Sequence, residues 1–300
     1  MKADLYLQFN LKIKMKKITI LASIILGFAT CSFAQNYGTL NIPQGQKYAV
    51  ENKVTTKSTS EMQGQSMETN ADVTSYYAIE VKDLKDNNYN MVNSVSAMKM
   101  NMSTMGQEMH FDSDKKEDMD GEMGTKFKGF INHPQPVVMD KSGNIIISKN
   151  TDTAKATDTD AQTTMMMKQM GGDPADLGYG AKMAFLALPK NAKVGTAWQD
   201  STSGDGVLRI TNYSIKEVKG NTATISISGT EKRDVKMEMN GMDINTKTTG
   251  TFSGEEMVDT KTGVISQNNL TADAKGTINV MGQEIPTTVS VTSVTTVKPI

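Results

Sequence analysis

Short glycine-containing turns interrupt runs rich in Val, Ile, Thr and Met along most of the chain. Glycine supplies the positive φ that two-residue hairpin turns need, and Asn-Gly is the strongest dipeptide of this kind. The runs between turns span about 10 to 15 residues, whereas strands usually have about 5 or 6. The turns of this type are Met62–Gln65, Met105–Glu108, Asn240–Asp243 and Met281–Glu284. The pattern predicts long antiparallel strands joined by tight hairpins.

A second kind of turn begins with aspartate and ends with glycine. Asp140–Gly143 precedes Ile145–Ile147, and Asp259–Gly263 precedes Val264. Further turns are predicted at Lys85–Asn88 and Lys219–Asn221. Each half of the chain therefore has glycine hairpins and one aspartate turn, although in a different order. This arrangement is consistent with an internal duplication.

Alternation within the long runs is visible but imperfect. In Val207–Ile215 the apolar set is interrupted by Arg209 and Thr211, and in Ile285–Val297 the apolar face includes Thr287. Long, weakly alternating strands are typical of a curved sheet. We predict a mainly β fold, a long-stranded curved antiparallel meander with two similar halves and one or two short helices in the middle. One continuous sheet and two packed lobes both remain open.

The middle of the chain differs from both flanks. Residues 150–162 are Thr, Asp and Ala with almost no apolar side chains, which is typical of a solvated linker. A short helix is predicted over 163–170, and a second over 174–188, where Asp173 is a good N-cap and Pro189 a stop. Its apolar residues at helical spacing are Leu177, Ala181, Ala184, Phe185 and Leu188. This helix is expected to lie across the concave face of the sheet.

The N-terminal residues read as a secretory signal. Met15–Lys17 is basic, Ile18–Ala29 is apolar, and Ser32–Ala34 places small residues at the two positions that a signal peptidase requires. The apolar stretch is shorter than the roughly 20 residues of a membrane-spanning helix. Cleavage is expected between Ala34 and Gln35, and residues 1–14 are expected to be an upstream extension. The expected parts are 1–34 signal peptide with extension, 35–149 N-terminal β half, 150–198 linker and helical insert, and 199–300 C-terminal β half.

The single cysteine, Cys31, suggests lipid attachment as an alternative. The preceding Phe28–Thr30 fits a lipoprotein processing site poorly, so plain cleavage after Ala34 is preferred. The mature chain then has no cysteine, and no disulfide contributes to its stability. We expect an exported protein of the periplasm, associated with the outer membrane, or secreted.

Charge and hydropathy exclude several classes of partner. The first 34 residues hold five lysines and one aspartate, so their removal takes the formal net charge from −1 to −5. No basic stripe remains for nucleic acid. The mature chain also has no apolar run long enough for a transmembrane helix.

Two stretches resemble an uncharacterised family of exported bacterial proteins, a domain of unknown function. They are Gly45–Val50, which opens the first strand, and Leu188–Trp198 at the midpoint, with the Met-Gly-Gln hairpins in addition. The resemblance covers nearly all of the mature chain. It implies secretion and a β-rich body, and it brings no activity and no catalytic residues. In architecture alone, a curved sheet with covering helices is similar to the half-barrels of lipoprotein carriers.

Methionine is the most conspicuous candidate for chemistry, with 23 in the chain. Period-two spacing puts Met98, Met100 and Met102 on one strand face, and thioethers select Cu(I). Methionine also fills irregular apolar surfaces, and we favour packing or lipid contact over metal. His110 and His133 lack zinc-site spacing. No cofactor and no metal site are expected.

The remaining polar motifs do not predict catalysis. Asp112–Glu122 resembles a calcium loop, but its alignment puts Lys116 and Phe127 at ligand positions, so a solvated charged loop is predicted. No nucleophile elbow or phosphate loop is present. We therefore expect a non-enzymatic protein that binds a hydrophobic ligand or lipid in a sheet cleft. The candidate ligand-binding residues are Leu177, Met183, Phe185, Trp198, Met98 and Met100.

Two alternatives remain for the function. One is a Met-rich copper-binding protein that uses Met98, Met100 and Met102. The other is a structural or interaction module whose exposed, Thr-rich sheet edges pair with another envelope protein.

Overall fold

Twelve strands form one antiparallel sheet in this computed structural model, which describes residues 38–62, 64–146, 178–204, 206–239 and 242–300. The sheet order is β6-β5-β3-β2-β1-β12-β11-β10-β9-β8-β7, with β4 also paired to β3. The first half has β1 (Lys47–Met62), β2 (Gln65–Lys85), β3 (Asn88–Thr104), β4 (Gln107–Asp112), β5 (Gln135–Asp140) and β6 (Ile145–Ile146). The second has β7 (Ala197–Gly204), β8 (Val207–Lys219), β9 (Thr222–Met239), β10 (Met242–Asp259), β11 (Ile265–Val280) and β12 (Gln283–Pro299). The predicted mainly β meander is confirmed.

The first and last strands join the two halves into one sheet. β1 and β12 pair without interruption from Tyr48 opposite Pro299 to Ser60 opposite Thr287. Neighbouring strands within each half mostly follow one another along the chain, as a meander requires. Of the two arrangements left open by the sequence, the structure therefore has the continuous sheet.

Several predicted hairpin turns are present with the expected backbone. Met105 and Gly106 have φ values of 51° and 77°, and Met281 and Gly282 have 52° and 85°. Two consecutive residues with positive φ are the signature of a type I′ turn, whose twist matches that of paired strands. The Asp86–Asn87 turn has the same form, with φ values of 52° and 64°. The predicted turn at Asn240–Gly241 lies outside the described residues.

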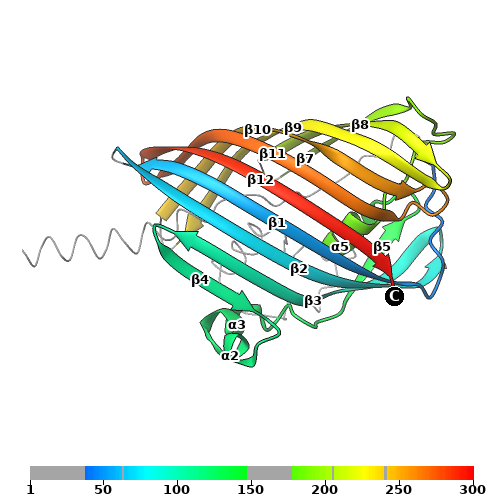
Figure 1. Cartoon of the computed structure of the whole chain (residues 1–300), viewed down its shortest axis with the longest axis horizontal. Helices are drawn as coiled ribbons and strands as arrows, with labels where there is room; N and C mark the ends of the chain where they lie inside the picture. Colours follow the sequence, from blue (N-terminus) through cyan, green and yellow to red (C-terminus); the bar gives the residue numbers. More distant parts are fainter. Residues whose placement is uncertain (1–37, 63, 147–177, 205, 240–241) are drawn as a thin grey trace, which may run out of the picture.

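The sheet curves into an open trough (Figure 1). Four register shifts interrupt three strand pairings, and such bulges bend a strand and increase its twist. Glycines on the inner face allow neighbouring backbones to approach closely. A Cβ on Gly229 would lie 2.1 Å from the carbonyl oxygen of Ile210, and one on Gly254 would lie 1.9 Å from that of Asn269. These positions exclude any larger residue in this geometry.

One end of the trough is closed by the N-terminal stretch and by the segment after α5 (Tyr179–Ala184). The Gly38 amide donates to the Leu188 carbonyl at 2.6 Å. The Tyr89 hydroxyl donates to the Leu40 carbonyl at 2.8 Å and accepts from the Ile42 amide at 3.1 Å. These bonds anchor the buried Leu40 and Ile42 in the core. Figure 1 shows α5 on the concave side of the sheet.

The second predicted helix, 174–188, is wrong in its C-terminal boundary. α5 ends at Ala184, and Phe185 is extended, with φ −137° and ψ 134°. Phe185 forms an antiparallel bridge with Val264, and its ring packs edge-on against Tyr48. This tertiary pairing overrides the helical spacing. Residues 150–162, 163–170 and 174–177 lie outside the described residues.

The predicted charged loop at Asp112–Glu122 is also partly wrong. Lys116–Asp120 is helix α2, and Glu122–Phe127 is helix α3. The Phe127 ring is fully buried at 5.1 Å from the Phe111 ring of β4. The packing of Phe127 against the sheet accounts for the helical structure. The many charged residues around it had instead favoured the prediction of a solvated loop. α2 and α3 bring the short helices to three among the described residues.

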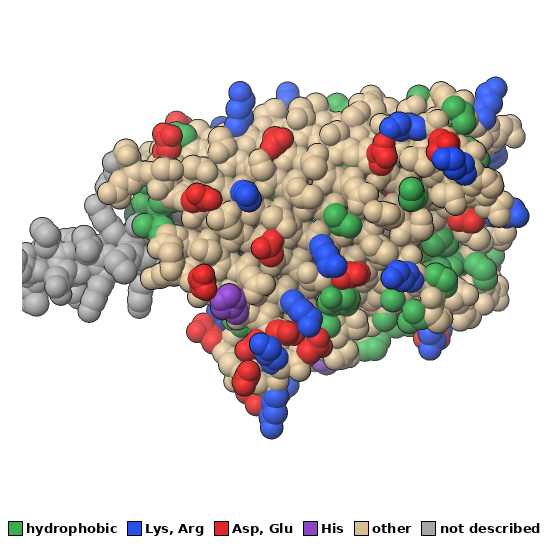
Figure 2. Space-filling model, viewed as in Figure 1, with side chains coloured by type: hydrophobic (Ala, Val, Ile, Leu, Met, Phe, Trp, Pro, Cys, Tyr) green, Lys and Arg blue, Asp and Glu red, His purple; other side chains and the backbone are tan. Residues whose placement is uncertain are grey.

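The face of the molecule turned toward the viewer in Figure 2 is predominantly polar. Acidic and basic side chains are interspersed over it rather than gathered into fields of one sign.

Candidate functional site

A line of polar side chains crosses the concave face of the sheet. Glu256 lies opposite Asn268, Asn268 opposite Thr295, Thr295 opposite Asn52, and Asn52 opposite Ser75. We call these five residues, on β10, β11, β12, β1 and β2, the polar belt. Glu256, Thr295, Asn52 and Ser75 are each at most 5% exposed. Polar groups with so little exposure carry a desolvation cost that must be met by partners.

Hydrogen bonds satisfy part of the polar belt. The Asn268 amide donates to Glu256 Oε1 at 2.9 Å. Asn52 Oδ1 accepts from Thr295 Oγ1 at 3.2 Å and from Ser293 Oγ at 3.1 Å. These bonds fix the orientation of the belt side chains across four strands.

Glu256 is the least expected member of the polar belt. Among the described residues it forms a hydrogen bond with Asn268 and no salt bridge with any cation. Burial raises the pKa of Glu256 to about 7, and the hydrogen bond from Asn268 opposes this rise only in part. A buried acid without a positively charged partner is a feature that proteins tend to retain at functional sites.

A cavity of about 100 Å³ separates the polar belt from the segment that covers it. One wall consists of strand residues, including Asn52, Glu256, Asn268, Ser293 and Thr295. The opposite wall consists of residues from α5 and the extended stretch after it: Tyr179, Lys182, Met183, Phe185 and Leu186. The cavity thus has polar groups on the sheet and mostly apolar groups on its cover.

Arg209 of β8 lines the same cavity and is itself buried. Its guanidinium lies 3.9 Å from the centre of the Phe252 ring, a cation–π arrangement. Its Nη1 donates to Glu231 Oε2 at 3.4 Å, and Arg233 Nε donates to Glu231 Oε1 at 2.5 Å. Burial lowers the pKa of Arg209, while the Glu231 charge acts in the opposite direction. Glu231 and Phe252 together hold the Arg209 side chain at the cavity wall.

Tyr213 connects the cavity to the single tryptophan. The Tyr213 ring stacks on the Trp198 ring with centroids 5.0 Å apart and an interplanar angle of 8°. Tyr213 lines the cavity, and Trp198 packs against it and against an apolar cluster that includes Ile215 and Ile225. Burial raises the pKa of the Tyr213 hydroxyl, and the charges of Glu256 and Asp200 add to this effect. The fluorescence of Trp198 should therefore respond when a molecule enters the cavity.

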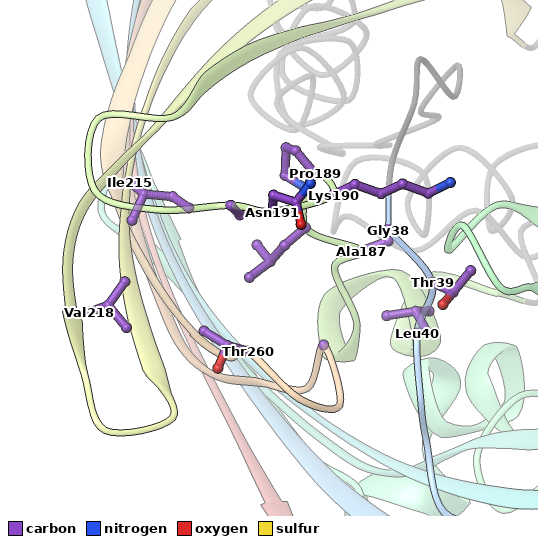
Figure 3. A pocket seen from close by; sticks show the side chains of 13 residues that line it. Gly38, Thr39, Leu40, Ala187, Pro189, Lys190, Asn191, Ile215, Val218 and Thr260 are labelled. Carbon is purple, nitrogen blue, oxygen red and sulfur yellow. The ribbon is translucent and has the colours of Figure 1, made fainter.

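A second, larger cavity of about 330 Å³ lies at the closed end of the trough (Figure 3). The stretch Ala187–Ala192 lines one side of it, and Leu40, Ile215 and Val218 contribute further apolar side chains. Thr39, Lys190, Asn191 and Thr260 give it a polar rim. A hydrogen bond of 2.8 Å joins the Leu186 amide, beside the first cavity, to the carbonyl of Gly263, which lines the second.

A protein-family model with the description "Family of unknown function (DUF6263)" matches residues 86–265, more than half of the chain. The chain belongs to this family. Membership confirms the resemblance to an uncharacterised family, and the description gives no activity. Comparison with curated proteins finds no match.

Solved structures with a similar course of strands have low sequence identity to this chain. A structure of lipovitellin and its lipid–protein interactions has a TM-score of 0.47 at 12% identity, and the match covers 86% of this chain and 25% of lipovitellin. An outer membrane channel from Pseudomonas putida F1 has a TM-score of 0.22 at 7% identity, with 89% and 100% covered. The translocator domain of autotransporter NalP from Neisseria meningitidis has 0.22 at 6%, with 86% and 90% covered. These scores support no functional conclusion. None of the described helices is long and apolar enough to cross a membrane.

The predicted ligand-binding residues fall in three places. Met183 and Phe185 line the belt cavity, and Trp198 stacks behind it on Tyr213. Met98 and Met100 lie elsewhere, in an apolar cluster with Phe111 and Phe127 under α2 and α3. Leu177, the cleavage site Ala34–Gln35 and Cys31 lie outside the described residues.

The methionine ladder has a packing explanation in this structure. Met98 and Met100 are buried among aromatic rings, and Met102 lies opposite Met109 on β4. Among the described residues, no group of three His, Cys, Asp or Glu side chains is arranged to hold a metal ion. The copper and interaction-module alternatives stay predictions.

The residues that sequence reasoning missed are the polar ones on the apolar face. Asn52, Arg209 and Glu256 each occupy an inward position of a strand, as Asn52 does between Val50 and Val54. In the sequence, these residues are visible only as polar residues that interrupt the alternation of apolar and polar positions. These interruptions become informative only when the strand register brings them side by side.

Proposed function

We propose that the protein is an exported, non-enzymatic protein of the cell envelope that binds an amphipathic small molecule in its trough. The observation that carries this proposal is the polar belt, a set of buried polar groups facing a cavity on an otherwise apolar wall. An amphipathic ligand would meet polar atoms at the belt and apolar side chains beyond it. The signal-like N-terminal sequence supports export.

The energetics of the belt favour a binding role over a purely structural one. A folded core is stabilised most simply by apolar side chains, and each buried polar group without full partners costs about 1–3 kcal/mol. Glu256 carries such a cost, with one hydrogen bond from Asn268 among the described residues. A bound ligand that supplies the remaining partner would recover part of this cost.

The two cavities give such a ligand separate polar and apolar regions. The cavity of about 100 Å³ beside the belt suits a small polar group, and the one of about 330 Å³ offers apolar contacts with Leu40, Ile215 and Val218. The stretch Leu186–Leu188 lies between them and would have to shift for one molecule to span both. Nothing in the arrangement of the belt resembles a nucleophile with its base.

Trp198 provides the test. The chain has one tryptophan, and its ring stacks on the cavity-lining Tyr213. We expect a saturable change in Trp198 emission when the purified, refolded protein is titrated with lysophosphatidylethanolamine below its micelle concentration.

Two leucine substitutions on β12 supply a matched control for this titration. Ser293→Leu fills the cavity beside Asn52 and should abolish the change, whereas Ser290 is exposed on the outer face, so Ser290→Leu should leave it intact. Equal responses from the two folded variants, or no response from the unmodified protein, would contradict binding in the trough.

A further inference from the structure

We propose that the belt cavity binds a primary ammonium group, which takes the place of the proton on the Glu256 carboxyl. The amphipathic ligand of the function proposed above would then be an amine with an apolar tail, and this assignment rests on that function. The carboxyl O–H bond breaks, its proton passes to solvent, and the carboxylate accepts a hydrogen bond from the ammonium. The net charge of the cavity therefore does not change on binding.

Glu256 is surrounded on the sheet by groups that carry no charge. Ile225 on β9 and Asn268 on β11 lie beside it. The neighbours on the same face of β10 are Gly254 and Val258. Among the described residues, Glu256 accepts a hydrogen bond from Asn268 and forms no salt bridge. An ionised carboxylate here would lack a positive partner, and burial raises the pKa of Glu256 to about 7.

The other ionisable groups near the cavity have partners of their own. The guanidinium of Arg209 is held over Phe252, which lies about 13 Å along β10 from Glu256 at the usual rise of an extended strand. The further groups are Tyr179 and Lys182 of α5, Asp200 of β7, Tyr213 of β8, and Glu231 and Arg233 of β9.

These groups do not decide the binding of an ammonium. Arg209, Arg233, Lys182 and Asp200 each take part in further interactions, so no free charge is attributed to them. The charge of Glu256 acts on the Tyr213 hydroxyl, which stays neutral because burial raises its pKa. Because the ammonium replaces a proton, the net charge that these groups face is the same before and after binding.

The sheet wall of the cavity presents mainly hydrogen-bond acceptors. The hydrogen bond from Asn268 to Glu256 Oε1 leaves two oxygens, Glu256 Oε2 and Asn268 Oδ1. Neither oxygen is among the described polar atoms that are buried without a partner, so both keep surface in the cavity that their residues line. An ammonium at this place would donate to both oxygens.

The hydroxyl groups of β12 add two further acceptors. Ser293 and Thr295 donate to Asn52 Oδ1 at 3.1 and 3.2 Å, and they therefore offer a ligand their lone pairs. The amide nitrogen of Asn52 is the donor beside them. A primary ammonium has three N–H donors and no acceptor, so it complements a wall on which acceptors predominate.

The size of the cavity agrees with a primary ammonium. A volume of about 100 Å³ corresponds to roughly three water molecules at their liquid volume of about 30 Å³. An ammonium with the first methylene groups of its tail suits this space, whereas N-methyl groups would fill it and remove the N–H donors. The tail would contact Met183, Phe185 and Leu186 of the cover.

The experiment compares head groups on one alkyl chain. Octylamine carries a primary ammonium, octyltrimethylammonium carries the same charge without N–H donors, and octanol carries an uncharged hydroxyl. Binding to the refolded protein is measured by Trp198 emission and by calorimetry at pH 6 and pH 8. At pH 8 we expect octylamine to bind at least about tenfold more tightly than the other two, the size of one charge-assisted contact.

The exchange for a proton gives octylamine a specific pH dependence. Glu256, with its pKa of about 7, is mostly protonated at pH 6 and mostly ionised at pH 8. The affinity for octylamine should therefore fall about tenfold from pH 8 to pH 6, with release of close to one proton per amine bound at pH 6. Octanol should show neither effect.

Two substitutions on β10 assign these effects to the inner face. Glu256→Gln keeps an acceptor for Asn268 and should remove both the preference for octylamine over octanol and its pH dependence. Glu255→Gln, on the outer face, is the matched control and should leave both unchanged. Circular dichroism checks that each variant is folded.

The outcomes separate the ammonium site from amphiphile binding in general. Equal affinity for octylamine and octyltrimethylammonium, or a pH dependence that survives Glu256→Gln, would overturn the ammonium site and leave amphiphile binding intact. No binding of octylamine would likewise overturn the ammonium site. If lysophosphatidylethanolamine also gives no response, the proposed function itself fails.

Discussion

Replacement of Phe252 by alanine is expected to lower the free energy of unfolding by about 3–5 kcal/mol. The Phe252 side chain is 3% exposed, and its ring lies over Gly229, where a Cβ would be 2.3 Å from the ring. The ring also carries the guanidinium of Arg209 at 3.9 Å. Alanine would leave a cavity over Gly229 and remove the aromatic ring that contacts the guanidinium of the buried Arg209. Urea denaturation followed by circular dichroism measures the change.

Two further variants serve as controls for Phe252→Ala. Phe130→Ala removes the same ring at a half-buried position near α3 and should cost clearly less. Phe252→Leu keeps most of the apolar volume and should fall between wild type and Phe252→Ala. A loss below about 1 kcal/mol for Phe252→Ala would show that the ring does not support the trough as described.

Glu256→Gln is expected to stabilise the ligand-free protein at pH 8 and to have little effect near pH 4. Burial holds the pKa of Glu256 at about 7, against 4.5 for the unperturbed group. This difference corresponds to a stability effect on the order of 3 kcal/mol. The neutral glutamine removes the buried charge while its side-chain oxygen still accepts from Asn268.

The sign of this effect follows from the direction of the shift. The unfolded chain releases the Glu256 proton near pH 4.5, whereas the folded protein holds it until about pH 7. The free energy of unfolding therefore falls as the pH rises from about 4.5 to 7. Above about pH 7 the destabilisation by Glu256 is constant. Below about pH 4.5 both states are protonated and the cost disappears.

Urea denaturation of protein refolded without ligand, at pH 4, 6 and 8, measures the difference between wild type and Glu256→Gln. The adjacent Glu255 lies on the outer face and pairs with Lys216, so Glu255→Gln is the matched control and should show no such pH-dependent gain. A difference between wild type and Glu256→Gln that is the same at all three pH values would contradict the buried, uncompensated carboxylate.

The turns and the class of fold were predictable because both depend on local chemistry. Met105–Gly106 and Asp86–Asn87 need positive φ, and glycine, asparagine and aspartate tolerate it most readily. Long runs of β-forming residues that are joined by such tight turns are compatible with few folds other than an antiparallel meander. The end of α5 was not predictable in this way, because Phe185 pairs with Val264, far along the chain.

The candidate site was only partly predictable, for a related reason. Met183 and Phe185 were selected as apolar residues of a covering helix, and both line the cavity. Glu256 was not selected, because alternation assigns a polar residue to the outer face by default, and Arg209 was noted only as an interruption of an apolar set. Their inward positions follow from the register of strands on either side, which a single sequence does not encode locally.

The most direct test of binding in the trough is native mass spectrometry of the protein isolated without detergent from the cells that produce it. We expect a mature chain that begins at Gln35 and carries an extra mass extractable into organic solvent, in wild type and Ser290→Leu but not in Ser293→Leu. Loss of the extra mass only when the inner face is changed would locate the ligand in the trough. A bare wild-type mass, or an extra mass that Ser293→Leu retains, would contradict the proposed binding site.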